Sequence, residues 1–254
     1  VPLNAMRRLL IILFLLAISA AVVWTLFRWN QSSTAVVDPW SAVPQQSAII
    51  VELPDALATW DQFTHTSQHW SSLEHLPKVA AVGRLLTQVI TRAENDAALR
   101  GSLKGIPVLA SVMRTGGEQV DLLLAFVPKA GDDVQMHTMA DVLKVDEAAL
   151  HNLKNGGTVQ CRPDTALPIL SLHVQQGIWL LATSSAMMDE ALLQLKSRSP
   201  ITSEPLLQEA RSTLGGGAEA HVLVHLERTK NLLHTWWKPT MIDTQDVPTG
   251  WAAL

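Results

Sequence analysis

The sequence predicts an α+β domain that follows a single N-terminal transmembrane helix. An uncharged apolar run near the N-terminus has the length of a membrane span. After it, short segments rich in β-branched residues and bounded by Gly and Pro predict antiparallel β-hairpins. Between these segments, apolar residues recur at helical spacing. We expect one domain over residues 45–254, in which antiparallel hairpins form a sheet and helices pack on one side of it.

The apolar run extends from Leu9 to Phe27 without a charged residue. As a helix it would span about 28 Å, close to the thickness of a bilayer core. Arg7 and Arg8 precede the run, and Trp24 and Trp29 lie near its far end, where indole rings favour the membrane interface. These residues predict a membrane anchor.

The flanking charges predict how the anchor is oriented. Arg7, Arg8 and the amino terminus outweigh Arg28, so residues 1–8 are expected to form a cytoplasmic stub. Residues 28–44 would then form a periplasmic tether. The main domain would be periplasmic, held at the inner membrane by one span.

A cleavable signal peptide is the alternative to this anchor. Ser19-Ala20-Ala21 fits a small-x-small cleavage site. The apolar run continues from Val22 to Phe27 beyond that site, which favours an anchor that is retained.

The charge of the chain argues against nucleic acid as a partner. The formal net charge is -4 at pH 7. Without the three arginines at the anchor, 16 basic residues stand against 23 acidic ones, so the exported part is near -7. An acidic domain repels phosphate backbones.

Cys161 is the one cysteine in the sequence, so no disulfide can form within the chain. We favour its interpretation as a small residue in a strand. A bond to another chain and a nucleophilic role are the alternatives.

The first half of the domain is predicted to contain a strand, helices and a hairpin. Ala48 to Leu53 is typical of a strand and is followed by Pro54. Two further strands flank a turn at Gly116-Gly117, where a positive φ costs little. The predicted helices are 56–63, 79–90 (opened by Pro77) and 97–103, and the hairpin strands are 108–114 and 120–127.

The second half is predicted to contain a similar hairpin and more helices. Its strands, 167–174 and 178–183, flank Gln175-Gln176-Gly177. Ser184 is expected to cap a helix in which Met188, Leu192 and Leu195 share one face. Other predicted helices are 139–143, 147–153, one opened by Ser203 and Pro205, and 229–237, which follows a strand at 222–226.

One strand–helix unit occurs twice in the sequence. Ala48 to Leu53 and the helix after it resemble Ala220 to Leu226 and the helix that ends at Trp237. An internal duplication and a chance similarity both fit this observation. With a duplication, the second copy would be incomplete, and we would expect the sequence to be a fragment.

No group of residues predicts a metal site or a catalytic site. His65 and His69 lack the glutamate of a zinc-protease motif. His221 and His225 would share one face of a strand about 13 Å apart, too far for one ion. No cofactor is expected.

Other polar and aromatic residues have structural explanations or indicate an interface. Asp189 and Glu190 are expected to complement the positive end of their helix. Trp236 and Trp237 are candidate interface residues, because adjacent helical positions cannot both point inward. 

The sequence from Leu167 onward resembles a known group of proteins. Its segments LSLHVQQGIWLLATSSAMMDEALLQL and SEPLLQEARSTLGGGAEAHVLVHLERTKNLL, with VPQQSAIIVELPD near the anchor, are similar to uncharacterised membrane-anchored envelope proteins of Bacteroidetes, of the domain-of-unknown-function 3352 type. The resemblance implies a longer protein with further strands. It implies no catalytic residues.

The sequence therefore favours a non-enzymatic binding or scaffolding role in the cell envelope, with an envelope protein as partner and the membrane bound through Leu9 to Phe27. The alternative is a glycan- or peptide-processing hydrolase whose site is completed by a missing C-terminal part.

Overall fold

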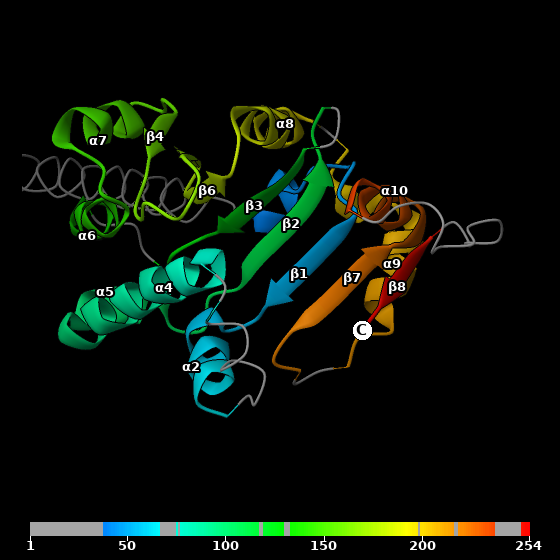
Figure 1. Cartoon of the computed structure of the whole chain (residues 1–254), viewed down its shortest axis with the longest axis horizontal. Coiled ribbons are helices and arrows are strands. Elements are labelled where there is room, and N and C mark those ends of the chain that lie inside the picture. Colours follow the sequence, from blue (N-terminus) through cyan, green and yellow to red (C-terminus); the bar gives the residue numbers. More distant parts are fainter. Residues whose placement is uncertain are drawn as a thin grey trace, which may run out of the picture. The chain divides into compact units, whose positions relative to one another are not determined.

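The computed structural model describes residues 38–66, 75, 77–116, 119–129, 133–197, 199–215, 218–236 and 250–254. Within them, an eight-stranded antiparallel sheet has the strand order β4-β5-β6-β3-β2-β1-β7-β8 (Figure 1). This confirms the predicted α+β class and antiparallel sheet. The strands are β1 (Ile49–Leu53), β2 (Val108–Arg114), β3 (Val120–Phe126), β4 (Val159–Cys161), β5 (Leu170–Gln175), β6 (Ile178–Ala182), β7 (His221–His225) and β8 (Trp251–Ala253).

The helices of the described residues connect these strands. Two of them, η1 (Pro39–Ala42) and η2 (Ile201–Ser203), are short 3-10 helices. The α-helices are α2 (Ala56–Thr66), α4 (Pro77–Asn95), α5 (Ala97–Leu103), α6 (Asp133–Leu143), α7 (Glu147–Lys154), α8 (Ser185–Lys196), α9 (Pro205–Ser212) and α10 (Leu226–Trp236).

Both predicted hairpins are confirmed. β2 pairs with β3, and β5 pairs with β6. The second turn contains Gln176 and Gly177 with φ of 54° and 84°, and Gly116 in the first turn has a φ of 57°. In the second turn, positive φ at both central residues matches the right-handed twist of the strands, which explains why that sequence forms a tight hairpin.

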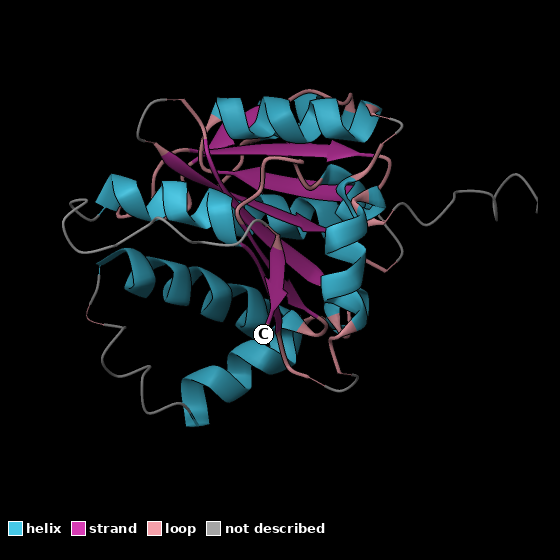
Figure 2. Ribbon diagram, turned by 90° about the vertical axis from the view of Figure 1, so that its right-hand side faces the viewer, coloured by secondary structure: helices cyan, strands magenta, loops and turns pink. Residues whose placement is uncertain are grey.

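Helices lie on both sides of the sheet, so the predicted packing on one side was wrong (Figure 2). Leu172 and Trp179 form a core cluster with residues of α4, α5, α6 and α7 on one face. Leu180 and Ala182 point to the other face, next to α8, and are fully buried. The segment IWLLA is apolar at every position, which is the pattern of a strand covered on both faces. LSLHV alternates instead, but its polar residues Ser171 and His173 are buried as well.

The buried face of α8 is not centred on the apolar face that Met188, Leu192 and Leu195 share. The helix buries Met187, Met188, Ala191 and Gln194. Leu192 and Leu195 are only partly buried, whereas Met188 is buried. The buried residues of α8 thus lie about one position before the residues of the shared apolar face. On this side, α8 packs small or flexible side chains against β3, β5 and β6.

The folded unit begins at Asp38, seven residues earlier than the boundary at residue 45 expected from the sequence. Asp38 caps η1 by accepting a hydrogen bond from the backbone N–H of Trp40. Trp40, Ala42 and Val43 are buried. The last part of the expected tether thus packs into the domain.

The predicted anchor, Leu9 to Phe27, lies outside the described residues, and so do Arg7, Arg8, Trp24 and Trp29. Among the residues that are described, none of the helices combines the length and hydropathy needed to cross a bilayer.

Candidate functional site

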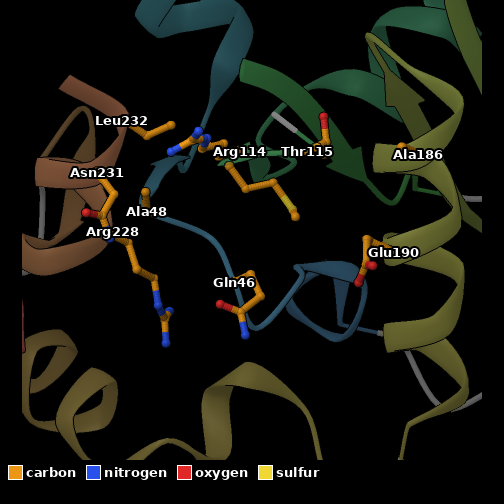
Figure 3. A pocket seen from close by; sticks show the side chains of 11 residues that line it. Gln46, Ala48, Arg114, Thr115, Ala186, Glu190, Arg228, Asn231 and Leu232 are labelled. Atoms are coloured by element: carbon orange, nitrogen blue, oxygen red, sulfur yellow. The ribbon is translucent and has the colours of Figure 1, made fainter. Parts of the chain in front are cut away.

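A pocket of about 440 Å³ lies between α8 and α10 (Figure 3). Helix α8 contributes Ala186 and Glu190 to one wall, and α10 contributes Arg228, Asn231 and Leu232 to the opposite wall. We call this cavity the α8–α10 pocket. Its walls come from segments about 40 residues apart in sequence, so no local motif could reveal it.

The remaining lining comes from the ends of two central strands. Met113 and Arg114 belong to the last residues of β2, and Thr115 follows them. Gln46 and Ala48 come from the segment before β1. The pocket therefore combines an apolar surface with two guanidinium groups, two carboxamides and one carboxylate.

Arg228 is held in place by several contacts. Its Nη1 donates a hydrogen bond to the Ser47 carbonyl oxygen at 3.1 Å. The guanidinium lies 5.7 Å from the ring centre of Trp251, whose Nε1 donates to Glu204 Oε1 at 3.0 Å. Burial lowers the pKa of Arg228, although Glu204 and Glu227 oppose this change. A guanidinium remains charged at pH 7 despite such a shift, so the pocket contains a positioned cation.

His225 supports the start of α10 beside this arginine. Burial and the positive charge of Arg228 lower the pKa of His225. The imidazole is therefore neutral at pH 7, and its Nδ1 accepts a hydrogen bond from the backbone N–H of Arg228 at 3.3 Å. Its ring also contacts Trp251 edge-to-face, with 5.2 Å between ring centres.

A buried carboxylate lies next to the pocket and ties α8 to the sheet. Asp121 Oδ1 accepts hydrogen bonds from Thr183 Oγ1 at 2.9 Å and Gln119 Nε2 at 3.2 Å. Asp121 Oδ2 accepts from Ser184 Oγ at 2.7 Å and from Thr115 Oγ1. Because four donors already occupy its oxygens, Asp121 is a structural group and a poor proton acceptor.

The two histidine pairs have separate surroundings. His65 is exposed on α2 beside Asp61, and His69 lies outside the described residues. His221 Nδ1 lies 3.3 Å from Glu52 Oε2, whereas His225 lies against Trp251 at the other end of β7. No set of three His, Cys, Asp or Glu residues within the described ranges could hold a metal ion.

Cys161 lies in β4 and is buried, as the strand interpretation predicts. Burial raises the pKa of its thiol to about 11. The thiolate is the nucleophilic form, so Cys161 is poorly suited to catalysis at neutral pH.

The explanation given for Asp189 and Glu190 was wrong. Helix α8 begins at Ser185, and its first turn contains no acidic residue. The dipole effect falls off within the first turn, so it does not explain these carboxylates. Glu190 instead lines the α8–α10 pocket.

The candidate interface residues Trp236 and Trp237 lie mostly outside the described residues. Trp236 is the last residue of α10, but its side chain is outside the described part, as is all of Trp237. The sequence missed Arg114 and Arg228. Their local signal is weak: Arg114 ends β2 before a turn, and Arg228 lies in the first turn of α10, and side chains at such connections often line a site.

Comparisons of this chain with protein-family models, with curated proteins and with solved structures gave no match.

Proposed function

We propose that this chain is a non-enzymatic binding domain of the cell envelope, anchored in the inner membrane by Leu9 to Phe27 and related to the envelope proteins that it resembles. The observation that carries the binding role is the α8–α10 pocket, whose lining includes the guanidinium groups of Arg114 and Arg228 and the apolar side chains of Met113 and Leu232. Concave sites with a few positioned polar groups on apolar surface are typical of small-molecule binding.

The charges of the pocket favour an anionic ligand. Arg114 and Arg228 lie toward α10, and Glu190 lies on α8 (Figure 3). A carboxylate or phosphate group can accept paired hydrogen bonds from a guanidinium, and Arg228 is already oriented by Ser47 and Trp251. Met113 and Leu232 would contact an apolar portion of the same ligand.

The reactive groups of the described residues support binding over catalysis. Among the described residues, Glu190 is the single carboxylate in the lining, and glycoside hydrolysis commonly uses two. The Thr115 hydroxyl donates to Asp121, and no histidine in the lining could activate it as a nucleophile. A hydrolase completed by further residues is the competing hypothesis.

A thermal-shift experiment on the full chain in detergent tests the proposal. Small dicarboxylates, phosphomonoesters and dipeptides would be screened for a compound that raises the Tm. We expect at least one such compound. Its apparent affinity, obtained from the rise in Tm with ligand concentration, should be about tenfold weaker in Arg228→Gln and in Arg114→Gln. Arg84→Gln is the control, because Arg84 pairs with Asp164 at an exposed site.

The competing hypothesis predicts a different result. Turnover of a glycan or peptide substrate that is abolished in Glu190→Gln would support the hydrolase and contradict the binding role. If a ligand raises the Tm of the wild type and of both pocket variants by the same amount, the α8–α10 pocket is excluded as its binding site.

A further inference from the structure

The α8–α10 pocket has charges of opposite sign on its two facing walls. Arg228 on α10 provides a positive charge, and Glu190 on α8 provides a negative one (Figure 3). Within the described ranges, no ion pair joins Glu190 to Arg228, so a ligand that lies between the two walls can contact both charges. The lining therefore differs from a simple anion site, in which the charged groups are all basic.

Helix α8 holds Glu190 on the side that faces the cavity. It buries Met187, Met188 and Ala191 on its opposite side. Ala186 and Glu190 are four residues apart, which places them on one face of the helix, and both are exposed and line the pocket. Because Ala186 has a small side chain, a ligand group can reach the Glu190 carboxylate along this face.

The two charges together select a class of ligand. A carboxylate accepts paired hydrogen bonds from a guanidinium, which favours its position at Arg228. If the same ligand extended a second anionic group toward α8, the Glu190 carboxylate would repel that group, whereas an ammonium group would be attracted. The charge pattern therefore favours a zwitterion over a dicarboxylate or another dianion.

The polar group between the two walls suits a peptide. Gln46 lies between Arg228 and Glu190 in the view of Figure 3 and lines the pocket. A carboxamide can donate a hydrogen bond to a carbonyl oxygen and accept one from an N–H, and a peptide group offers both partners. The cavity volume of about 440 Å³ lies within the range of about 300–1000 Å³ that is typical of small-molecule sites. Leu232 adds an apolar surface for a side chain of the ligand.

We propose that the α8–α10 pocket binds a short peptide with free ends, with its carboxylate at Arg228 and its ammonium group at Glu190. The Gln46 carboxamide hydrogen-bonds the peptide group between these ends. This inference rests on the proposed function of the same pocket, and it narrows the ligand class from anions to zwitterionic peptides.

Alanyl-leucine and propanoyl-leucine are matched probes for this inference. The two compounds differ only in the ammonium group, which a hydrogen atom replaces in propanoyl-leucine. Isothermal titration calorimetry with the full chain in detergent gives the Kd of each. We expect propanoyl-leucine to bind about tenfold more weakly, because it forms no charge-assisted hydrogen bond with Glu190. This comparison does not depend on the folding of a protein variant.

Three variants assign the preference to individual residues. In Glu190→Gln, the two probes should bind with equal affinity, since the carboxylate that recognises the ammonium group is lost. In Arg228→Gln, both probes should bind about tenfold more weakly, and the preference for alanyl-leucine should remain. Asp189→Asn is the control, because Asp189 is an exposed carboxylate next to Glu190 that does not belong to the lining. This control should retain the tenfold preference.

The outcomes separate this inference from the proposed function. If both probes bind the wild type equally and Arg228→Gln weakens both, the pocket binds an anion and the zwitterion inference alone is overturned. If alanyl-leucine does not bind but a dicarboxylate raises the Tm, the inference is again overturned while the binding role stands. If Arg228→Gln changes neither affinity, the probes bind elsewhere, and the inference and the role of the pocket are both overturned. Release of leucine from alanyl-leucine would overturn both in favour of a hydrolase.

Discussion

Asp121 shows at the scale of single residues how a buried charge is retained. Burial alone would raise the pKa of Asp121, but hydrogen bonds from Thr115, Ser184, Thr183 and Gln119 lower it below its usual value of 3.8. The carboxylate form is therefore favoured in the folded protein. It joins β3, the end of β6 and the start of α8 through side chains that are distant in sequence.

Replacing Asp121 with Asn should decrease the free energy of unfolding by about 3 kcal/mol at pH 7, because buried donors lose a charged acceptor. A folded-state pKa below the unfolded value stabilises the protein above about pH 4, and this stabilisation is lost as the pH falls through the folded-state pKa. Urea unfolding followed by Trp fluorescence at pH 7 and pH 3 measures both effects. A difference between wild type and Asp121→Asn that is as large at pH 3 as at pH 7 would contradict the role of the charge.

Cys161 should resist thiol reagents in the folded protein. Its thiol is 5% exposed and has a pKa of about 11, so little thiolate exists at pH 8. We expect labelling by iodoacetamide at pH 8 to be about 1000-fold slower in the native chain than in guanidinium chloride. Mass spectrometry gives both rates. Rapid labelling of the native chain would return a nucleophilic role to consideration.

At the scale of elements, the start of α8 has two structural roles: it caps the helix and it forms part of the α8–α10 pocket. Ser184 Oγ accepts a hydrogen bond from the Met187 backbone N–H at 3.1 Å and donates one to Asp121. The same turn places Ala186 and, one turn later, Glu190 in the α8–α10 pocket. A cap that the sequence predicts thus also fixes one wall of the candidate site.

Replacing Ser184 with Ala should decrease the free energy of unfolding by about 2 kcal/mol, since the helix loses its cap and Asp121 loses a donor. Ser185→Ala is the matched control, because Ser185 is exposed at the adjacent position. Its effect should remain within about 0.5 kcal/mol. Urea unfolding measures both variants. An equal decrease in the free energy of unfolding in Ser184→Ala and Ser185→Ala would show that the Ser184 cap does not stabilise the protein.

At the scale of the whole molecule, the orientation of the proposed anchor, Leu9 to Phe27, can be tested directly. Alkaline phosphatase fused after Leu254 should be active in cells, because it folds only outside the cytoplasm. Reversing the charges with Arg7→Glu and Arg8→Glu should greatly decrease this activity. A fusion to a fluorescent protein that matures in the cytoplasm is the complementary control. Fluorescence of that fusion with the native arginines would contradict the periplasmic assignment.

Local features of the chain were predictable from the sequence because their causes are local. The hairpins β2–β3 and β5–β6 follow from apolar runs on either side of Gly turns, and the end of α5 follows from the breaks at Gly105 and Pro107. The strand β8 was not predicted, and β4 was indicated only by the interpretation of Cys161 as a strand residue. Each has only three residues, and so short a strand is stabilised by its neighbour in the sheet more than by its own sequence.

Fold class, both hairpins and most helix positions were thus determined by the sequence itself, through turn chemistry and hydrophobic spacing. The tertiary structure alone decided which faces are buried, where β1 and β7 meet, and which side chains form the α8–α10 pocket. Arg114, Glu190 and Arg228 belong to three separate elements, and only the packing of α8 and α10 at the end of β2 brings them to one cavity. These side chains come together through contacts between residues far apart in sequence, and local patterns in the sequence do not predict such contacts.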